Sequence, residues 1–326
     1  MRVGRPVLAA LAAAAAVAAA GCGSSGSDTT TETVQPATAP SMLIKRDPAN
    51  ARRPVIVMSS KNFTEEFVLG EIYTQALRAA GYRVRKKLNI GPEDVAYKAL
   101  RDGRIGSYPE YIGTALTNFC GVKAEAVPKV VARAYADTRR CVAKDGVAAL
   151  APTPFTDSNG FAMTEQRAQE LGIRKLSDLK GKAPDLVLSG SKECRTRPDC
   201  KLGLEQTYGV RFKRYFSVDL SLRHEVLTRG LADVSVVFTT DGQIRADKLR
   251  LLVDDKGFLP PYNVSLLLRD EVLRGAGPDL PRVVAKVQRG LTTRVMQELN
   301  SPVDLDHDTP EQAAKAYPQQ FGLIAP

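Results

Sequence analysis

Two hydrophobic patterns alternate along most of the chain. Short, largely apolar runs occupy positions 55–58, 185–189, 232–238 and 264–268, and the first is rich in β-branched residues. Such runs are typical of buried strands. Other segments repeat apolar residues every three or four positions, which is typical of helices with one buried face. This alternation predicts an α/β fold in which helices cover both faces of a parallel sheet.

The clearest amphipathic segment begins at Thr64. Glu65 and Glu66 follow at once, and acidic residues in a first turn complement the helix dipole. Thr64 itself is predicted to cap the helix, and Gly81 to end it. The apolar face of this helix comprises Leu69, Ile72, Tyr73, Ala76, Leu77 and Ala80.

The same alternation continues and then begins again. A strand is expected at 82–89 and a helix at 95–100, and the pattern restarts after residue 153. A second set of elements follows, including a helix at 202–208, and the region from residue 280 onwards is helical in pattern. The restart predicts two α/β lobes rather than one.

The beginning of the chain has the pattern of an export signal. Arg2 and Arg5 precede an uninterrupted apolar run at 7–20, and small residues then lead to Cys22. Residues 1–21 are therefore predicted to be a signal peptide, because the run is shorter than the roughly 20 residues needed to span a bilayer. A cysteine at this place is typical of bacterial lipoproteins, so we expect Cys22 to carry the lipid. An ordinary secreted protein with an incidental cysteine is the alternative.

A polar, low-complexity segment follows the predicted cleavage site. Residues 23–50 are rich in Ser, Thr, Gly, Pro and Ala and contain few large apolar side chains. Such a composition cannot bury enough apolar surface to fold. We therefore expect residues 22–52 to form a lipidated, flexible linker.

Composition and charge limit the classes of partner. Of the 326 residues, 44% are hydrophobic and 25% are charged, which is ordinary for globular proteins. The formal net charge is +10, but the basic residues are scattered and no nucleic-acid-binding motif is present. We therefore expect no nucleic-acid partner, and we interpret the charge as solvated surface near anionic lipid headgroups.

Four cysteines remain after Cys22: Cys120, Cys141, Cys194 and Cys200. An even number in an exported chain indicates disulfides, and the spacings do not match those of zinc sites, so no metal is expected. Three pairings are possible. We favour Cys120–Cys141 and Cys194–Cys200, because each closes a local loop.

Four blocks in order along the chain carry the candidate chemistry. They lie at residues 59–66, 108–114, 237–242 and 254–262. The first three follow strand-like runs, and ligands of open α/β sheets bind beyond the carboxyl ends of strands. These blocks predict a small-molecule site built from distant parts of the chain.

The blocks resemble the ligand-capturing layout of the osmoprotectant-binding proteins of ABC importers, which carry glycine betaine, choline and related compounds. The resemblance covers about residues 54–325. It implies a two-lobed periplasmic-binding-protein fold of type II with a hinge between the lobes. We expect residues 53–152 plus 253–326 to form the first lobe, and residues 153–252 to form an inserted second lobe.

The resemblance also implies an aromatic box for a quaternary ammonium group. Its places fall on Tyr111, Phe238, Tyr262 and Asn159. The sequence departs from the family pattern at two of them, because Phe238 stands where tyrosine is usual and Asn159 where an aromatic residue is usual. A box of three rings can still hold a trimethylammonium group, whereas Asn159 can equally serve an amide, a hydroxyl or a primary ammonium group.

Four further positions are implied for the rest of the ligand. The family's anion-binding positions fall on Lys61, Thr114 and Arg197, and Asp157 matches an acid that lies near the bound cation. Lys61 at a helix N-terminus opposes the helix dipole, which favours an anion-holding role. His224 is interpreted as a packing residue outside the site.

The function that the sequence predicts is solute binding without covalent chemistry or a cofactor. The protein is expected to be a monomer, anchored by lipid in the cell envelope outside the cytoplasm, that delivers a small osmolyte to an ABC permease with its ATPase. The same fold with an amino acid or a polar amide or amine as ligand is the first alternative. An exported enzyme is the second, and it lacks a G-x-S-x-G elbow, a zinc signature and a phosphate-binding glycine loop.

Overall fold

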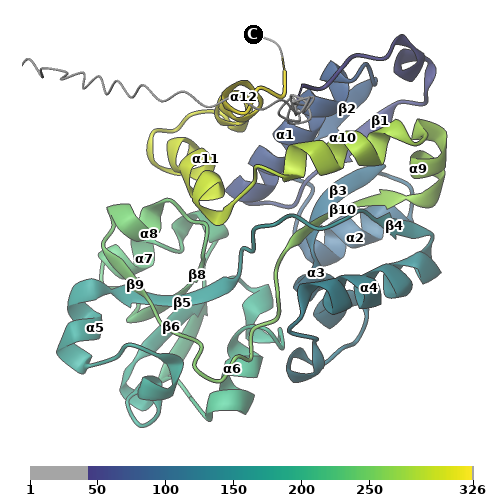
Figure 1. Cartoon of the computed structure of the whole chain (residues 1–326). Coiled ribbons are helices and arrows are strands. Elements are labelled where there is room, and N and C mark those ends of the chain that lie inside the picture. The colour runs from purple at the N-terminus through teal and green to yellow at the C-terminus, as the bar shows by residue number, and fades with distance from the viewer. Residues whose placement is uncertain (1–42, 325–326) are drawn as a thin grey trace, which may run out of the picture. The chain divides into compact units, whose positions relative to one another are not determined.

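The computed structural model describes residues 43–324. The predicted signal peptide, Cys22 and most of the predicted linker lie outside these residues. Two five-stranded sheets organise the described chain (Figure 1). The first sheet has the order β2-β1-β3-β10-β4. Its strands are β1 (Ile56–Ser59), β2 (Val84–Lys87), β3 (Ser107–Tyr111), β4 (Val147–Ala149) and β10 (Val264–Arg269).

The second sheet is formed by the residues between β4 and β10, and its order is β7-β6-β8-β5-β9. Its strands are β5 (Asn159–Thr164), β6 (Val187–Gly190), β7 (Arg214–Ser217), β8 (Val234–Phe238) and β9 (Leu249–Leu251). The four apolar runs read from the sequence correspond to β1, β6, β8 and β10, so these strand predictions are confirmed to within two residues at each end.

Both sheets are mixed, which corrects the expectation of a parallel sheet. Strand β1 pairs in parallel with β2 and β3, whereas β10 is antiparallel to β3 and β4. In the second sheet β6 is parallel to β7 and β8, whereas β5 is antiparallel to β8 and β9. The antiparallel strands β5 and β10 both follow segments that cross from the other sheet. The rule that makes helix-connected strands parallel does not apply to such connections.

The two crossing segments, β4 to β5 and β9 to β10, run side by side between the sheets (Figure 1). Thr156 and Asn263 form an antiparallel bridge there. The backbone N–H of Asp157 donates to the carbonyl of Tyr262 over 3.2 Å. This pairing places two of the predicted site residues, Asp157 and Tyr262, next to each other at the junction of the sheets.

Helices cover the sheets. In the first lobe, α1 packs against α10, α11 and α12, and this group shares the largest hydrophobic core with β1 and β10. A second core lies under α5 and α6 in the second lobe. The helices are α1 (Thr64–Ala79), α2 (Glu93–Arg101), α3 (Ile112–Thr114), α4 (Val131–Val142), α5 (Glu165–Leu171), α6 (Lys201–Tyr208), α7 (Glu225–Thr228), α8 (Gln243–Ala246), α9 (Asp270–Ala276), α10 (Asp279–Gln288), α11 (Thr293–Leu305) and α12 (Pro310–Gln320).

The start of α1 differs from the sequence expectation. Phe63 is the capping residue and makes no side-chain capping bond, and Thr64 is already the first helical residue. The Thr64 hydroxyl donates instead to Asp304 Oδ1 over 2.5 Å. The prediction of a threonine cap is therefore wrong, because the helix begins one residue earlier than a cap at Thr64 requires, and the hydroxyl contacts Asp304 of α11 instead.

The last residues assigned to the linker pack against the first lobe. The Ile44 side chain is buried in the largest core, and its backbone N–H donates to the carbonyl of Leu323 over 2.7 Å. The Asn50 amide donates to the carbonyl of Ala80 over 2.9 Å. Folded structure thus begins by residue 43, because one buried isoleucine and these bonds tie the segment to the C-terminal end of the lobe.

The structure contains the two disulfides that the sequence analysis favoured. Cys120–Cys141 joins the segment after α3 to the end of α4, with its Cα atoms 6.0 Å apart. Cys194–Cys200 closes a short loop between β6 and α6, with its Cα atoms 5.2 Å apart. The first disulfide braces one lobe, whereas the second fixes a loop at the junction between the lobes.

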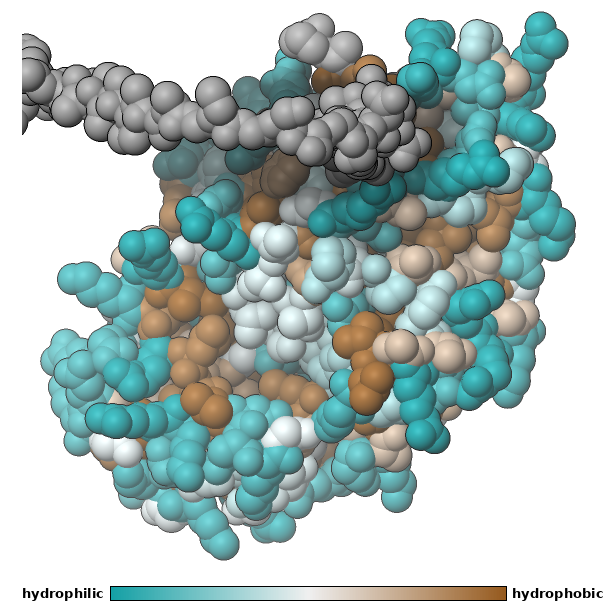
Figure 2. Space-filling model, in the orientation of Figure 1, coloured by the Kyte–Doolittle hydropathy of each residue, from teal (hydrophilic) through white to brown (hydrophobic). Residues whose placement is uncertain are grey.

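The face of the molecule drawn in Figure 2 is largely hydrophilic, and its hydrophobic residues form separate patches. Hydrophilic residues dominate the rim of this face. Among residues 43–324, no helix has the length and apolar character that crossing a membrane requires.

Candidate functional site

All eight predicted ligand residues line one cavity of about 550 Å³ between the two sheets. They are Lys61, Tyr111, Thr114, Asp157, Asn159, Arg197, Phe238 and Tyr262. The topology explains their convergence. Tyr111 and Phe238 are the last residues of β3 and β8, and Lys61 follows β1 by two positions. Asn159 begins the antiparallel strand β5 and lies opposite Phe238 in the register, so strand ends of both sheets meet at the cavity.

Lys61 occupies a buried corner of the cavity formed by the first lobe. Its Nζ atom lies 2.6 Å from Glu110 Oε1 and 3.6 Å from Glu66 Oε1. The same ammonium group sits 4.5 Å from the centre of the Tyr111 ring. Burial lowers the pKa of Lys61, but the two carboxylates outweigh burial and raise it. Lys61 is therefore a cation whose charge is matched within its own lobe.

Two carboxyl groups beside this corner have strongly shifted pKa values. Glu65 accepts hydrogen bonds from the Tyr111 hydroxyl at 2.6 Å and from the Asn300 amide at 3.2 Å. Burial raises the pKa of Glu65 to about 7 and that of Glu66 to about 8. Because neutral carboxyls are favoured in this environment, the Tyr111 wall rests on acids that hold protons near neutral pH.

Asp157 lies on the crossing segment and is buried. Its Oδ1 atom accepts from the Thr240 backbone N–H at 3.2 Å and from the Thr239 hydroxyl at 3.3 Å. Burial, with the nearby carboxylates of Glu65 and Asp241, raises the pKa of Asp157 well above its ordinary value. A cation in the cavity would reverse this shift, because an opposite charge favours the ionised carboxylate.

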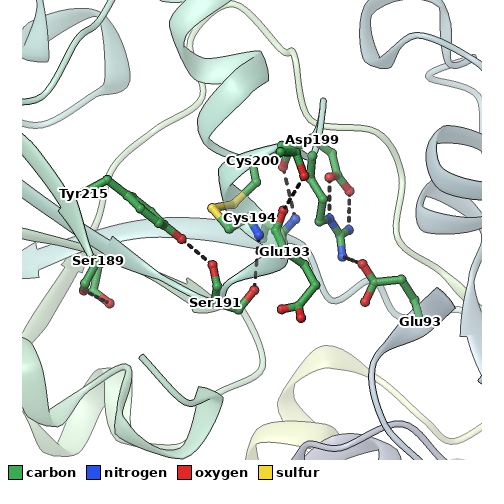
Figure 3. Close-up of a disulfide and its surroundings, with 12 residues drawn as sticks. Glu93, Ser189, Ser191, Glu193, Cys194, Asp199, Cys200 and Tyr215 are labelled. Carbon is green, nitrogen blue, oxygen red and sulfur yellow. Dashed lines mark hydrogen bonds and ion pairs between the residues drawn. A yellow bond between two sulfur atoms is a disulfide. The ribbon is translucent and has the colours of Figure 1, made fainter. Parts of the chain in front are cut away.

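Arg197 belongs to the loop closed by Cys194–Cys200 and lines the cavity. Figure 3 shows this disulfide with Asp199 and Glu93 nearby. The Nε and Nη2 atoms of Arg197 donate to the two oxygens of Asp199 over 2.8 and 2.6 Å. Its Nη1 atom donates to Glu93 Oε1 over 2.7 Å, and Nη2 lies 3.5 Å from the Thr114 hydroxyl. Glu93 and Thr114 belong to the first lobe, so the guanidinium group connects the two lobes across the cavity.

Asn159, Asp199 and Tyr262 form one hydrogen-bonded group. The Tyr262 hydroxyl donates to Asp199 Oδ2 over 2.6 Å. The Asn159 amide nitrogen is 3.3 Å from the Tyr262 hydroxyl and 3.1 Å from the Asp199 carbonyl. Asn159 thus contacts Tyr262 directly, and through Asp199 this tyrosine is also linked to Arg197.

A further aromatic residue, Phe63, lines the cavity and was not predicted as a site residue. Its ring centre lies 4.9 Å from that of Phe238 and 6.1 Å from that of Tyr111. The three rings form a continuous wall, while Tyr262 lines the cavity elsewhere. Phe63 stands in the same block as Lys61, so its position beside the strand end was the signal that could have indicated it.

A buried ion pair lies behind Phe238. The Arg223 guanidinium sits 4.9 Å from the centre of the Phe238 ring and forms a two-bonded pair with Asp241. Asp241 also contacts His224 Nε2 at 2.8 Å and accepts from the Phe238 backbone N–H at 2.8 Å. Despite burial, Arg223 and His224 lower the pKa of Asp241 to about 2. His224 therefore packs behind the wall and does not line the cavity.

No group of three or more potential metal ligands occurs among the described residues. The chemistry that the cavity offers is instead that of recognition: aromatic faces, buried carboxyls and two cations with carboxylate partners. Aromatic faces attract organic cations, and such cavities between lobes are common ligand sites.

Comparisons with known proteins agree with this geometry. Residues 54–320 match the family described as the substrate binding domain of ABC-type glycine betaine transport system. A glycine-betaine-binding protein of Pseudomonas aeruginosa is 28% identical over 287 residues, covering 84% of this chain and 90% of that protein. An ergothioneine transport permease/ergothioneine binding protein of Helicobacter pylori is 27% identical over 279 residues, which cover 85% of this chain but only 49% of that protein.

The fold has known counterparts as well. A crystal structure of a glycine betaine/carnitine/choline ABC transporter protein superposes with a TM-score of 0.66 at 24% identity, covering 82% of this chain and 98% of that one. The chain has the two-lobed fold of periplasmic binding proteins. It belongs to the family of substrate-binding domains of ABC-type glycine betaine transport systems. It is therefore the solute-binding component of an ABC transport system and not an enzyme.

Proposed function

We propose that the cavity between the lobes binds a small quaternary-ammonium or zwitterionic osmoprotectant and that the protein delivers it to an ABC permease. The observation that carries the proposal is the convergence of all eight predicted ligand residues on one cavity. They come from both sheets and from both crossing segments, and no common local pattern brings them together.

The aromatic wall supports a cationic headgroup. A quaternary ammonium group donates no hydrogen bonds, so ring faces and nearby carboxylates must hold it. Each ring contributes about 0.5 to 2 kcal/mol when water is excluded. Phe63, Tyr111 and Phe238 form the wall, Tyr262 faces the same cavity, and Asp157 supplies a buried carboxyl.

The crossing segments support a hinge. We propose that residues 53–152 with 253–326, and residues 153–252, move as two bodies about the Thr156–Asn263 bridge. Ligand binding would favour the closed form, which the permease would recognise. The protein would act as a monomer, held at the membrane by a lipid on Cys22 and by the linker that follows it.

Isothermal titration of the mature chain with glycine betaine and with choline tests the proposal. We expect binding of at least one of them, and Phe238→Ala should weaken it roughly 2- to 30-fold, the equivalent of one lost cation–π contact. Phe212→Ala is the matched control, because Phe212 is a partly buried ring of the same lobe outside the cavity. Absence of binding by the folded protein, or equal loss in both variants, would contradict the proposal.

A further inference from the structure

Both cations that were expected to hold a ligand carboxylate already have carboxylate partners. Lys61 is paired with Glu110 and Glu66. Arg197 is paired with Asp199 and Glu93, at 2.6 and 2.7 Å. An incoming carboxylate therefore meets no unpaired cation at either place, and it would have to displace a carboxylate that the chain itself supplies.

The two sets of partners differ in how firmly they are held. Asp199 is fully buried and accepts from Tyr262 as well as Arg197, so it belongs to the framework of the loop. Glu93 is the first residue of α2 and lines the cavity itself. Its Oε1 atom accepts from Arg197 Nη1 at 2.7 Å and from the Asn118 amide at 3.1 Å. Glu93 is the carboxylate that faces the ligand space.

Glu93 stands where a ligand carboxylate would bind Arg197. The Nε and Nη2 atoms of Arg197 donate hydrogen bonds to Asp199, and Nη1 donates to Glu93 across the cavity. A second carboxylate beside Nη1 would lie within hydrogen-bond range of the same donor as Glu93. Two like charges at such a separation repel, and the partial burial of the pair weakens the screening of this repulsion.

The charges around the rest of the cavity also disfavour a ligand carboxylate. Four acidic side chains line it, against three basic ones. The acidic residues are Glu93, Asp157, Glu193 and Asp219, and the basic residues are Lys61, Lys192 and Arg197. Since Lys61 and Arg197 are each paired with further carboxylates behind the lining, the cavity complements a ligand with net positive charge.

We propose that Glu93 is a specificity-determining residue that excludes carboxylate-bearing solutes by occupying Arg197. The cavity then selects an organic cation whose far end is uncharged, with a hydroxyl or other neutral polar group placed near Thr114 and Asn159. This inference rests on the proposed function, because it concerns the ligand class of the same site.

The test compares choline, a cation with a hydroxyl tail, with glycine betaine, a zwitterion with the same headgroup. Isothermal titration of the mature chain should show choline binding at least about tenfold tighter than glycine betaine. Glu93→Gln keeps the shape and the bond from Asn118 but removes the charge. It should tighten glycine betaine binding about tenfold and change choline binding less than about threefold.

Glu193→Gln is the matched control, since Glu193 lines the same cavity but takes part in none of the ion pairs found among the described residues. It should change the ratio of the two affinities by less than Glu93→Gln does, because Glu193 pairs with neither Lys61 nor Arg197. If Glu93→Gln changes both affinities by the same factor, Glu93 is a contact between the lobes without a role in specificity, and the inference is wrong.

Two other results would also overturn it. If the wild-type protein binds glycine betaine as tightly as choline, Glu93 does not exclude carboxylates, although the proposed function stands. If the folded wild-type protein and both variants bind neither compound, the proposed function fails together with this inference.

Discussion

Lys61 and Arg197 offer a direct comparison within one cavity. Arg197 has carboxylate partners at 2.6 and 2.7 Å, whereas Lys61 has Glu110 at 2.6 Å and the carboxyl group of Glu66 at 3.6 Å. The partners of Lys61, Glu66 in α1 and Glu110 in β3, both belong to the first lobe. Arg197 instead joins Asp199 of its own loop to Glu93 of the other lobe. Two residues predicted for the same task from sequence therefore have different structural settings.

Because the partners of Lys61 lie in one lobe and those of Arg197 in two, the two cations should respond differently to a ligand. Lys61, Glu66 and Glu110 are all almost completely buried, and Glu110 also accepts hydrogen bonds from the Tyr108 hydroxyl and from the Tyr111 backbone N–H. Rearranging this group would leave several buried groups without partners, which is costly. The Arg197–Glu93 ion pair lies across the cavity, so it can be broken when the lobes move or when a ligand binds. We expect Lys61 to matter mainly for folding and Arg197 mainly for specificity.

The largest effect is expected for Lys61→Met. Removing the ammonium group leaves the buried Glu110 carboxylate without its cation, and loss of one partner of a buried ion pair costs about 3 to 5 kcal/mol. Urea unfolding should show this loss of the free energy of unfolding. Lys86→Met, which removes a more exposed lysine from two carboxylates, should cost less than about 1 kcal/mol.

Arg197→Met sharpens the contrast. Its partner Glu93 faces the cavity and can be hydrated, but its other partner Asp199 is fully buried. The expected cost is therefore about 3 kcal/mol, the lower end of the range for breaking a buried ion pair. An unfolding free energy lowered as much as in Lys61→Met would remove the distinction between the two cations.

The next effect is a pH dependence that originates beside Lys61. The pKa of Glu66 is about 8 in the folded protein, against an ordinary value of 4.5. Between these values the folded state holds a proton that the unfolded state has lost. Stability must therefore fall as the pH rises from about 5 to about 8. With about 1.4 kcal/mol per pKa unit, the fall is on the order of a few kcal/mol.

Glu66→Gln tests this origin, because its neutral amide can still accept from the Lys61 backbone N–H, as Glu66 does at 3.0 Å. Unfolding free energies measured from pH 5 to pH 8 should be flatter in this variant than in the wild type. Glu311→Gln, at an exposed carboxylate, should keep the wild-type slope, and a slope that survives in Glu66→Gln would assign the effect to another group.

Smaller stability effects than that of Lys61→Met are expected for the disulfides, which extend the comparison to their loops. Chain entropy predicts a loss of about 3 kcal/mol for the 21-residue separation of Cys120–Cys141 and about 2 kcal/mol for the six-residue separation of Cys194–Cys200. For ligand affinity we expect the opposite order, with the larger loss on removing Cys194–Cys200. Replacing Cys194 and Cys200 by serine releases Arg197 and Asp199, whereas Cys120–Cys141 lies outside the cavity.

Titration calorimetry and urea unfolding on the two double-serine variants would check this reversal. The Cys194/Cys200 variant should bind choline at least about tenfold more weakly than the Cys120/Cys141 variant. Equal affinities would show that the loop holds Arg197 without its disulfide.

The hydrophobic pattern was informative where strands are buried on both faces. The runs that became β1, β6, β8 and β10 are short and largely apolar, so their assignment needed no tertiary information. Strands β4, β7 and β9 are three or four residues long. Runs of that length carry too little periodicity to separate them from loops.

The direction of the strands was not predictable in the same way. Alternating strands and helices predicted parallel sheets, but β5 and β10 are entered by segments that cross between the lobes. No local pattern marks such a segment, because its course depends on where the other sheet lies. The Thr64 cap failed for a similar reason, since Asp304 is 240 positions away.

The sequence alone determined the family, the two-lobed α/β class and the residues that would gather at the site, because strand ends, turn residues and ordered motifs are local properties of the chain. Only the tertiary structure decided the electrostatic state of that site. The partners of Lys61 and Arg197 come from α1, α2, β3 and the disulfide loop. Charges act through space rather than along the chain, so which cation is matched, and by which carboxylate, emerges only when the lobes are assembled.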